Sequence, residues 1–179
     1  MIARPSCKSF TPVGTWFVVS LVVTVAAGCG GSTIGTTAGG DAGTSGTKTC
    51  VALDDKLPAG APNVPIKVGP APAELLKEDL VVGTGAEVKP GATVSVDYIG
   101  ATCTTGKIFD SSFDGGKPVT FSLTEVIKGW TEGIPGMKVG GQRLLGIPAA
   151  QAYGTRGSPP DIGPNEPLWF VVTVKSASA

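Results

Sequence analysis

Histidine is absent from this chain of 179 residues. A Ser-His-Asp or Cys-His catalytic set is therefore excluded, and so is a zinc site of the HExxH type. Any general acid–base catalysis would have to use Asp, Glu, Lys or Tyr.

Charged residues are also few, at 16% of the chain, and they balance to a formal net charge of zero. This balance argues against a nucleic-acid-binding protein, which would carry a basic stripe. Apolar residues make up 41%, enough for the core of one domain. The 27 glycines and 15 prolines indicate many turns, loops or linkers.

The N-terminal residues resemble a targeting signal. Arg4 and Lys8 precede an apolar run at residues 13–27, which is shorter than the roughly 20 residues of a membrane span and is typical of a signal peptide. The run ends in Ala26-Ala27-Gly28-Cys29, similar to a bacterial lipoprotein signal.

We therefore expect residues 1–28 to be a signal peptide and Cys29 to be lipidated. The alternatives are an ordinary secretory signal and a retained N-terminal anchor. All three place the protein in the cell envelope, in the periplasm or on the outer surface, and the first attaches it to a membrane by lipid alone.

Residues 29–73 are predicted to form a linker. Residues 30–49 are rich in Gly, Thr, Ser and Ala and are expected to be disordered. Residues 58–72 carry a proline every few positions, which favours extended polyproline segments. The folded domain is then expected to span residues 74–179.

Cys50 and Cys103 are the cysteines that remain after the signal peptide and Cys29. Two cysteines without histidine cannot form a structural zinc site. In an oxidising compartment they could form a disulfide that closes a loop of about 50 residues. The alternative is two independent thiols.

The pattern of residues 74–179 predicts an α+β fold with about five strands. Apolar or alternating segments at residues 75–82, 93–99, 119–123, 142–148 and 168–174 are typical of strands. Helical spacing at residues 124–134, with Thr124 as a candidate N-cap, predicts one short helix. Because no regular crossover helices separate the strands, the sheet should be antiparallel.

The last strand has two apolar faces. Leu168, Phe170, Val172 and Val174 should face the core, and Trp169 and Val171 should face outward. An outward Trp-Val pair is either covered by the proline-rich segment or exposed as a binding patch. We favour the first.

Three blocks of sequence resemble the FKBP-type peptidyl-prolyl cis/trans isomerases. They are residues 94–123 (including FDSS), residues 125–154 (including EVIKGWTEG and AYG) and residues 162–174. The resemblance implies a twisted antiparallel sheet around one short helix. It implies an enzyme that rotates X-Pro peptide bonds of exported proteins without any cofactor or metal, assisting protein folding.

The resemblance also implies a site. Its proline pocket would be formed by Tyr98, Phe109, Val126, Ile127, Trp130, Ile162 at the rim, Tyr153 and Phe170. Four residues would be catalytic. Asp110 would lie beside the rotating carbonyl, the Tyr153 hydroxyl and the Ile127 N–H would donate hydrogen bonds to the peptide, and Tyr98 would complete the set. Phe121 is assigned to the core.

Several positions depart from the family pattern, among them Gly115 where an Arg is usual and Ser158 where a His is usual. These two positions leave open a second interpretation, a weakly active or inactive module of the envelope that binds prolyl peptides or acts as a chaperone. Macrolides such as tacrolimus or rapamycin are further expected ligands. We expect a monomer.

Overall fold

The structure is a computed structural model that describes residues 48–178. The predicted signal peptide, Cys29 and the first part of the predicted linker lie outside these residues. No helix within residues 48–178 combines the length and hydrophobicity needed to cross a membrane.

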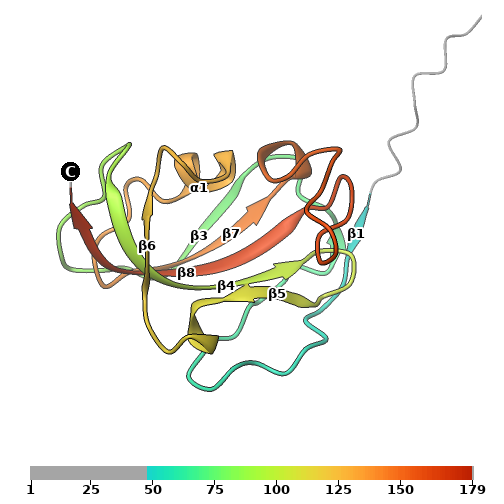
Figure 1. Cartoon of the computed structure of the whole chain (residues 1–179), viewed down its shortest axis with the longest axis horizontal. Coiled ribbons are helices and arrows are strands. Elements are labelled where there is room, and N and C mark those ends of the chain that lie inside the picture. The colour runs from blue at the N-terminus through green and yellow to red at the C-terminus, as the bar shows by residue number, and fades with distance from the viewer. Residues whose placement is uncertain (1–47, 179) are drawn as a thin grey trace, which may run out of the picture. The chain divides into compact units, whose positions relative to one another are not determined.

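A six-stranded antiparallel sheet forms the body of the fold (Figure 1). Its strands are β3 (Leu76–Val81), β4 (Thr93–Thr102), β5 (Ile108–Ser111), β6 (Val119–Ser122), β7 (Gln142–Ile147) and β8 (Leu168–Ser178). The order is β3-β7-β8-β4-β5, and β6 pairs with the first half of β4. The predicted antiparallel sheet with one short helix is therefore confirmed, with β5 as a strand that the sequence pattern did not predict.

The one α-helix within residues 48–178, α1 (Lys128–Gly133), is shorter than the predicted segment of residues 124–134. Ile127 is its N-cap, because Thr124 instead shares a 2.7 Å hydrogen bond with the Ser122 hydroxyl in the turn after β6. The helix lies close against β7. A Cβ added at Gly129 would lie 2.5 Å from Ile147, so glycine is needed for this approach.

Alternation along β8 separates two hydrophobic clusters. Leu168, Phe170, Val172 and Val174 belong to the inner cluster, which lies on the side of α1. Trp169 and Val171 belong to an outer cluster on the opposite face of the sheet. Both faces of the central strands are therefore buried.

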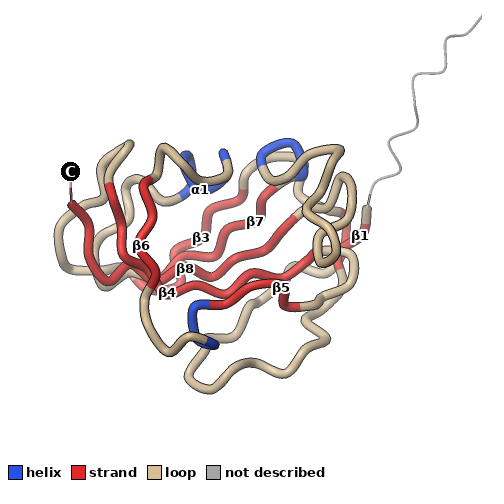
Figure 2. The backbone as a smooth tube through the Cα atoms, viewed as in Figure 1, coloured by secondary structure: helices blue, strands red, loops and turns tan. Residues whose placement is uncertain are grey.

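The outer face is covered by residues 48–73, which we call the strap. Figure 2 shows it as a long segment running beneath the sheet. It contains the short paired strands β1 (Thr49–Cys50) and β2 (Gly69–Pro70), and Cys50 forms a disulfide with Cys103. Val64 and Ile66 are buried in the outer cluster.

The strap covers Trp169 and Val171, as predicted for the proline-rich segment, and is packed against the sheet where residues 29–73 were predicted to be a linker. The physical reason is the outer face of β8, where Trp169 is 1% exposed and its Nε1–H donates to Cys50 Sγ over 3.3 Å. A bare Trp-Val face would leave a large apolar area in water, and the strap removes it.

An ion pair fixes the start of the strap. The buried Glu166 accepts hydrogen bonds from the Thr104 N–H at 2.8 Å and from Lys48 Nζ at 2.9 Å. Lys48 also donates to the Pro164 carbonyl at 2.9 Å. The start of the strap is thus held against the chain segment that leads into β8.

Candidate active site

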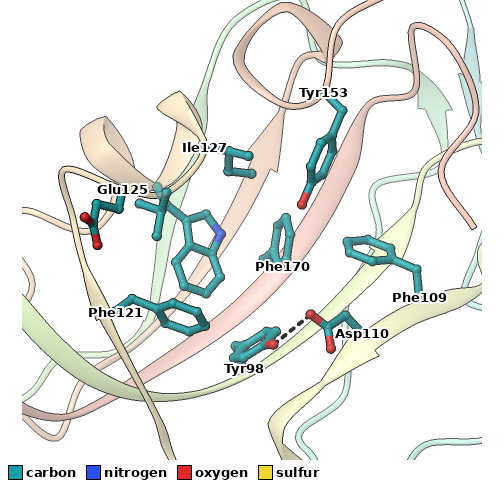
Figure 3. A pocket seen from close by; sticks show the side chains of 10 residues that line it. Tyr98, Phe109, Asp110, Phe121, Glu125, Ile127, Tyr153 and Phe170 are labelled. Atoms are coloured by element: carbon teal, nitrogen blue, oxygen red, sulfur yellow. Dashed lines mark hydrogen bonds between the residues drawn. The ribbon is translucent and has the colours of Figure 1, made fainter. Parts of the chain in front are cut away.

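A cavity of about 300 Å³ lies between α1 and the face of the sheet that α1 covers. It is lined by Tyr98, Phe109, Asp110, Phe121, Glu125, Val126, Ile127, Trp130, Tyr153 and Phe170. Figure 3 shows that these side chains converge from β4, β5, β6, β8, α1 and two loops. The volume suits a small ring or a short stretch of peptide.

Trp130 is the centre of the aromatic lining. Its indole meets Tyr98, Phe121 and Phe170 edge to face, with ring centroids 5.3, 5.4 and 5.4 Å away. Phe109 and Phe170 are arranged in the same way at 5.5 Å. Edge-to-face pairs of this kind hold aromatic rings in fixed orientations, so the apolar surface is preformed.

Gly100 in β4 allows the two phenylalanine walls to come together. An added Cβ there would lie 2.6 Å from Phe170 and 2.7 Å from Phe109. Any larger residue would push these rings apart and change the shape of the cavity. Sequence reasoning did not single out this position, because a glycine inside a strand indicates close packing without naming the partner.

Two side chains that follow Phe109, those of Asp110 and Ser112, hold Tyr98 in place. The Tyr98 hydroxyl donates to Asp110 Oδ2 at 2.7 Å, and the Tyr98 N–H donates to Ser112 Oγ at 3.0 Å. Ser111 caps the short helix η1 (Ser112–Asp114) by accepting from the Phe113 N–H. Capping is thus done by Ser111, and the carboxylate of Asp110 is left for Tyr98 and the cavity.

Burial raises the pKa of Tyr98 well above its usual value, and the hydrogen bond to Asp110 and the charge of that carboxylate raise it further. Burial also raises the pKa of Tyr153, with a smaller contribution from the charge of Asp110. Both hydroxyls are therefore protonated, and able to donate, at neutral pH.

Tyr153 and Ile127, which both line the cavity, bring hydrogen-bond donors to it. Figure 3 shows the Tyr153 hydroxyl directed toward the space above Phe170. Ile127 is the N-cap of α1, so its N–H belongs to the group that an α-helix leaves without an intrahelical partner. A carbonyl oxygen bound in the cavity could accept hydrogen bonds from both.

The charges at the cavity are negative. Among its ten lining residues, Asp110 and Glu125 are carboxylates, and neither lysine nor arginine is present. Within residues 48–178 no group of three His, Cys, Asp or Glu side chains could hold a metal ion.

Most of the residues that the sequence analysis assigned to the pocket line this cavity. The exception is Ile162, which is 3% exposed and packs in the inner cluster instead of lining the cavity. Phe121 and Glu125 line it although neither was assigned to the site. The alternation of residues 119–122 placed Phe121 on the inner face, but could not show that Trp130 would lie beside it.

Comparisons with known proteins agree on one family. The family model for FKBP-type peptidyl-prolyl cis-trans isomerase matches residues 85–175. A probable FK506-binding protein from Corynebacterium glutamicum is 47% identical over 65% of this chain and 98% of its own length. A 39 kDa FK506-binding nuclear protein from Drosophila melanogaster is 53% identical, and the match covers 55% of this chain but only 28% of that longer protein.

A solved structure is similar as well. The crystal structure of a peptidyl-prolyl cis-trans isomerase from Pseudomonas syringae pv. tomato matches with 37% sequence identity and a TM-score of 0.54. The match covers 59% of this chain and 76% of that one.

Proposed function

This chain belongs to the FKBP-type peptidyl-prolyl cis-trans isomerase family, and from this membership we propose that it rotates X-Pro peptide bonds in the cavity around Trp130. The observation that carries the proposal is the cavity itself. Its walls are aromatic, Tyr153 and Ile127 among its lining residues bring hydrogen-bond donors, and the Asp110 carboxylate is held beside it by Tyr98.

Rotation of an X-Pro bond is slow because the partial double bond of the amide gives a barrier of roughly 18–20 kcal/mol. No covalent bond breaks and no proton has to move. At the top of the barrier the amide is twisted, resonance is lost, and the carbonyl carbon is more electropositive. A site accelerates the reaction if it binds this twisted form better than either planar form.

Each lining group contributes to tighter binding of the twisted amide. The prolyl ring packs on Trp130 and Phe170, where water is excluded. The Ile127 N–H and the Tyr153 hydroxyl donate to carbonyl oxygens of the bound peptide. Asp110, held by Tyr98, places negative charge near the rotating carbonyl carbon. Each 1.36 kcal/mol of selective stabilisation gives about a tenfold faster rate.

The test is isomerisation of a short X-Pro peptide by the full chain and by Asp110→Asn and Trp130→Ala variants. Asp114→Asn is the matched control, because Asp114 belongs to the nearby helix η1 and is not among the residues that line the cavity. We expect wild type and the control to accelerate isomerisation and Asp110→Asn to lose at least tenfold in kcat/KM.

A folded wild-type protein that binds the peptide without accelerating its isomerisation would favour the second candidate, a prolyl-peptide binding module. The observation behind this alternative is Gly115, which ends helix η1 where a family arginine would add a cation near Asp110.

We further propose that the cavity binds FK506-type macrolides, in keeping with the names of the relatives. The altered rim at Gly115 and Ser158 should weaken this binding. Competition between tacrolimus and the X-Pro peptide tests it, and an unchanged isomerase rate at saturating drug would exclude it.

We also propose that the protein is exported, attached to a membrane through lipid on Cys29, and acts on exported proteins as a monomer. The support is the apolar run at residues 13–27 before Cys29 and the Cys50–Cys103 disulfide, since disulfides persist in oxidising compartments. Mass spectrometry of the protein from isolated envelopes should find Cys29 diacylated and N-terminal. An intact, unmodified N-terminus in the cytoplasm would exclude export.

A further inference from the structure

The strap follows the turn that joins β4 to β5. The Val51 N–H donates to the Cys103 carbonyl at 2.8 Å, and the Asp54 N–H donates to the Gly106 carbonyl at 3.0 Å. The fit at this turn is tight, because a Cβ on Gly106 would collide with the Ala52 carbonyl oxygen. Together with the Cys50–Cys103 disulfide, these contacts hold residues 50–55 along the turn.

Asp55 extends this contact to the first residue of β5. Its Oδ2 accepts a 2.7 Å hydrogen bond from the Ile108 N–H. β5 is four residues long and lies at the edge of the sheet, where β4 is its strand neighbour. The register between β4 and β5 also shifts between Gly100 and Ala101. A short, irregular edge strand is weakly held by its sheet alone, so a bond on its outer edge should matter.

β5 contacts the strap at its first residue and the cavity at the next two. The Ile108 side chain packs in the outer cluster together with Leu53 and Leu57 of the strap. The next residue, Phe109, lines the cavity, and the one after it, Asp110, bonds Tyr98. The Asp55 contact is therefore one residue away from the cavity wall and two away from the carboxylate of the proposed site.

We propose that Asp55 is a positioning residue for isomerisation, which holds β5 so that Phe109 and Asp110 keep their places at the cavity. This inference rests on the proposed function, since it concerns the same site. Asp55 does not line the cavity and acts through β5. The strap is thereby part of the enzyme and does more than cover an apolar face.

The test compares Asp55→Ala and Asp55→Asn with wild type in the full chain, using kcat/KM for an X-Pro peptide and hydrogen exchange of the Ile108 amide. Asn keeps a side-chain oxygen that can accept the same bond, whereas Ala removes it. Asp54→Ala is the matched control, because it removes a neighbouring carboxylate and keeps the backbone bond from Asp54 to Gly106. All rates are measured well below the melting temperature, where every variant is folded.

We expect Asp55→Ala to lose about 3- to 10-fold in kcat/KM, the range of one hydrogen bond. Its Ile108 amide should exchange about tenfold faster. Asp55→Asn should recover most of both values, and Asp54→Ala should match wild type.

An Asp55→Ala variant within twofold of wild type in kcat/KM would overturn the inference while leaving the proposed function intact. Equal losses in Asp55→Asn and Asp55→Ala would also overturn it. A wild type without isomerase activity would reject the proposed function. In that case, unchanged exchange at Ile108 would reject the structural role of Asp55 as well, whereas faster exchange would support it.

Discussion

The Tyr98 hydroxyl and the Asp110 carboxylate are joined by a 2.7 Å hydrogen bond that links β4 to β5 inside the proposed site. Tyr98 is 7% exposed, and its ring packs on Trp130. The bond thus connects a fixed aromatic ring to a carboxylate at the edge of the cavity, and it orients that carboxylate.

Removal of this bond should lower the isomerase rate without unfolding the protein. Tyr98→Phe keeps the ring and its packing but leaves Asp110 unrestrained, so we expect kcat/KM to fall about 3- to 10-fold. A double-mutant cycle with Asp110→Asn measures the coupling. If the two residues act as one unit, the losses should be clearly less than additive. Fully additive losses would contradict this relationship.

The raised pKa values of Tyr98 and Tyr153 predict activity that is insensitive to alkaline pH. Each pKa lies above the ordinary value of 10.0, so both donors should stay protonated up to that pH, and kcat/KM should be constant from about pH 7 to pH 10. The contribution of Tyr98 to stability should be complete below pH 10 and decline only above it. Loss of activity together with the appearance of tyrosinate absorbance below pH 10 would contradict this prediction.

The two carboxylates at the cavity predict a preference for substrate charge. With Asp110 and Glu125 among its lining residues, and no lysine or arginine, the cavity should favour Lys-Pro over Glu-Pro peptides. The expected ratio in kcat/KM is about 3- to 10-fold at low salt, because a solvent-exposed charge pair contributes roughly 1 kcal/mol.

Glu125→Gln should reduce this ratio, and so should about 0.5 M salt. Glu132→Gln is the matched control, since Glu132 lies on α1 and pairs with Lys128. Equal rates for the two peptides in wild type would show that these carboxylates do not select substrates.

Strand periodicity predicted the main features of the fold. In the last strand, alternation over residues 168–174 separated the residues of the inner cluster from Trp169 and Val171 of the outer one, because successive side chains of a strand point to opposite faces. The start of α1 was less predictable. Thr124 has the residue type of an N-cap, but a competing hydrogen bond to Ser122 holds it in a turn.

The packing of the strap and parts of the site were harder to predict from local sequence patterns, because they form through contacts between residues that are distant in the sequence. Val64 and Ile66 are isolated apolar residues between prolines, without the period of a helix or strand, so their own pattern indicated a linker. Only the outward pair Trp169 and Val171 predicted that the proline-rich segment would pack against the sheet. The burial of Val64 and Ile66 results from Trp169 on a distant strand. Likewise, Phe121 follows the pattern of an ordinary core residue, and only the folded chain brings it to 5.4 Å from Trp130.

An ion pair between Arg143 and Asp79 should make stability depend on pH at the acidic end. Arg143 is 8% exposed and donates to both carboxylate oxygens of Asp79 and to the Gly133 carbonyl. This hydrogen bonding holds the pKa of Asp79 below its usual value of 3.8. A lowered pKa contributes stability that is complete above the unfolded-state value and is lost as the pH falls through the folded-state value.

Asp79→Asn should therefore lower the free energy of unfolding by about 0.5–1 kcal/mol at pH 7, a range that allows for solvent at this half-exposed carboxylate. The difference from wild type should shrink below about pH 3.8. Urea unfolding at both pH values measures it. Glu78→Gln is the control, because its exposed pair with Lys67 should contribute less. An equal effect of both variants at pH 7 would contradict the special role of Asp79.

The Cys50–Cys103 disulfide should stabilise the protein because it restricts the conformations of the unfolded chain. It joins residues 53 positions apart, and a loop of that length predicts about 4 kcal/mol from chain entropy, with 2–4 kcal/mol typical of measured cases. Cys50→Ala/Cys103→Ala should unfold at correspondingly lower urea, and wild type in excess reductant should behave like the double variant.

The strap should remain partly docked in that variant, because Val64, Ile66 and Trp169 still bury apolar surface against one another. Limited proteolysis should then cut residues 48–73 before the sheet is attacked, whereas the oxidised wild type should resist at both places. If the double variant and the oxidised wild type unfold at the same urea concentration and are cut at the same rate, the strap is held by its noncovalent contacts alone. The Glu166–Lys48 pair would then be the next contact to remove.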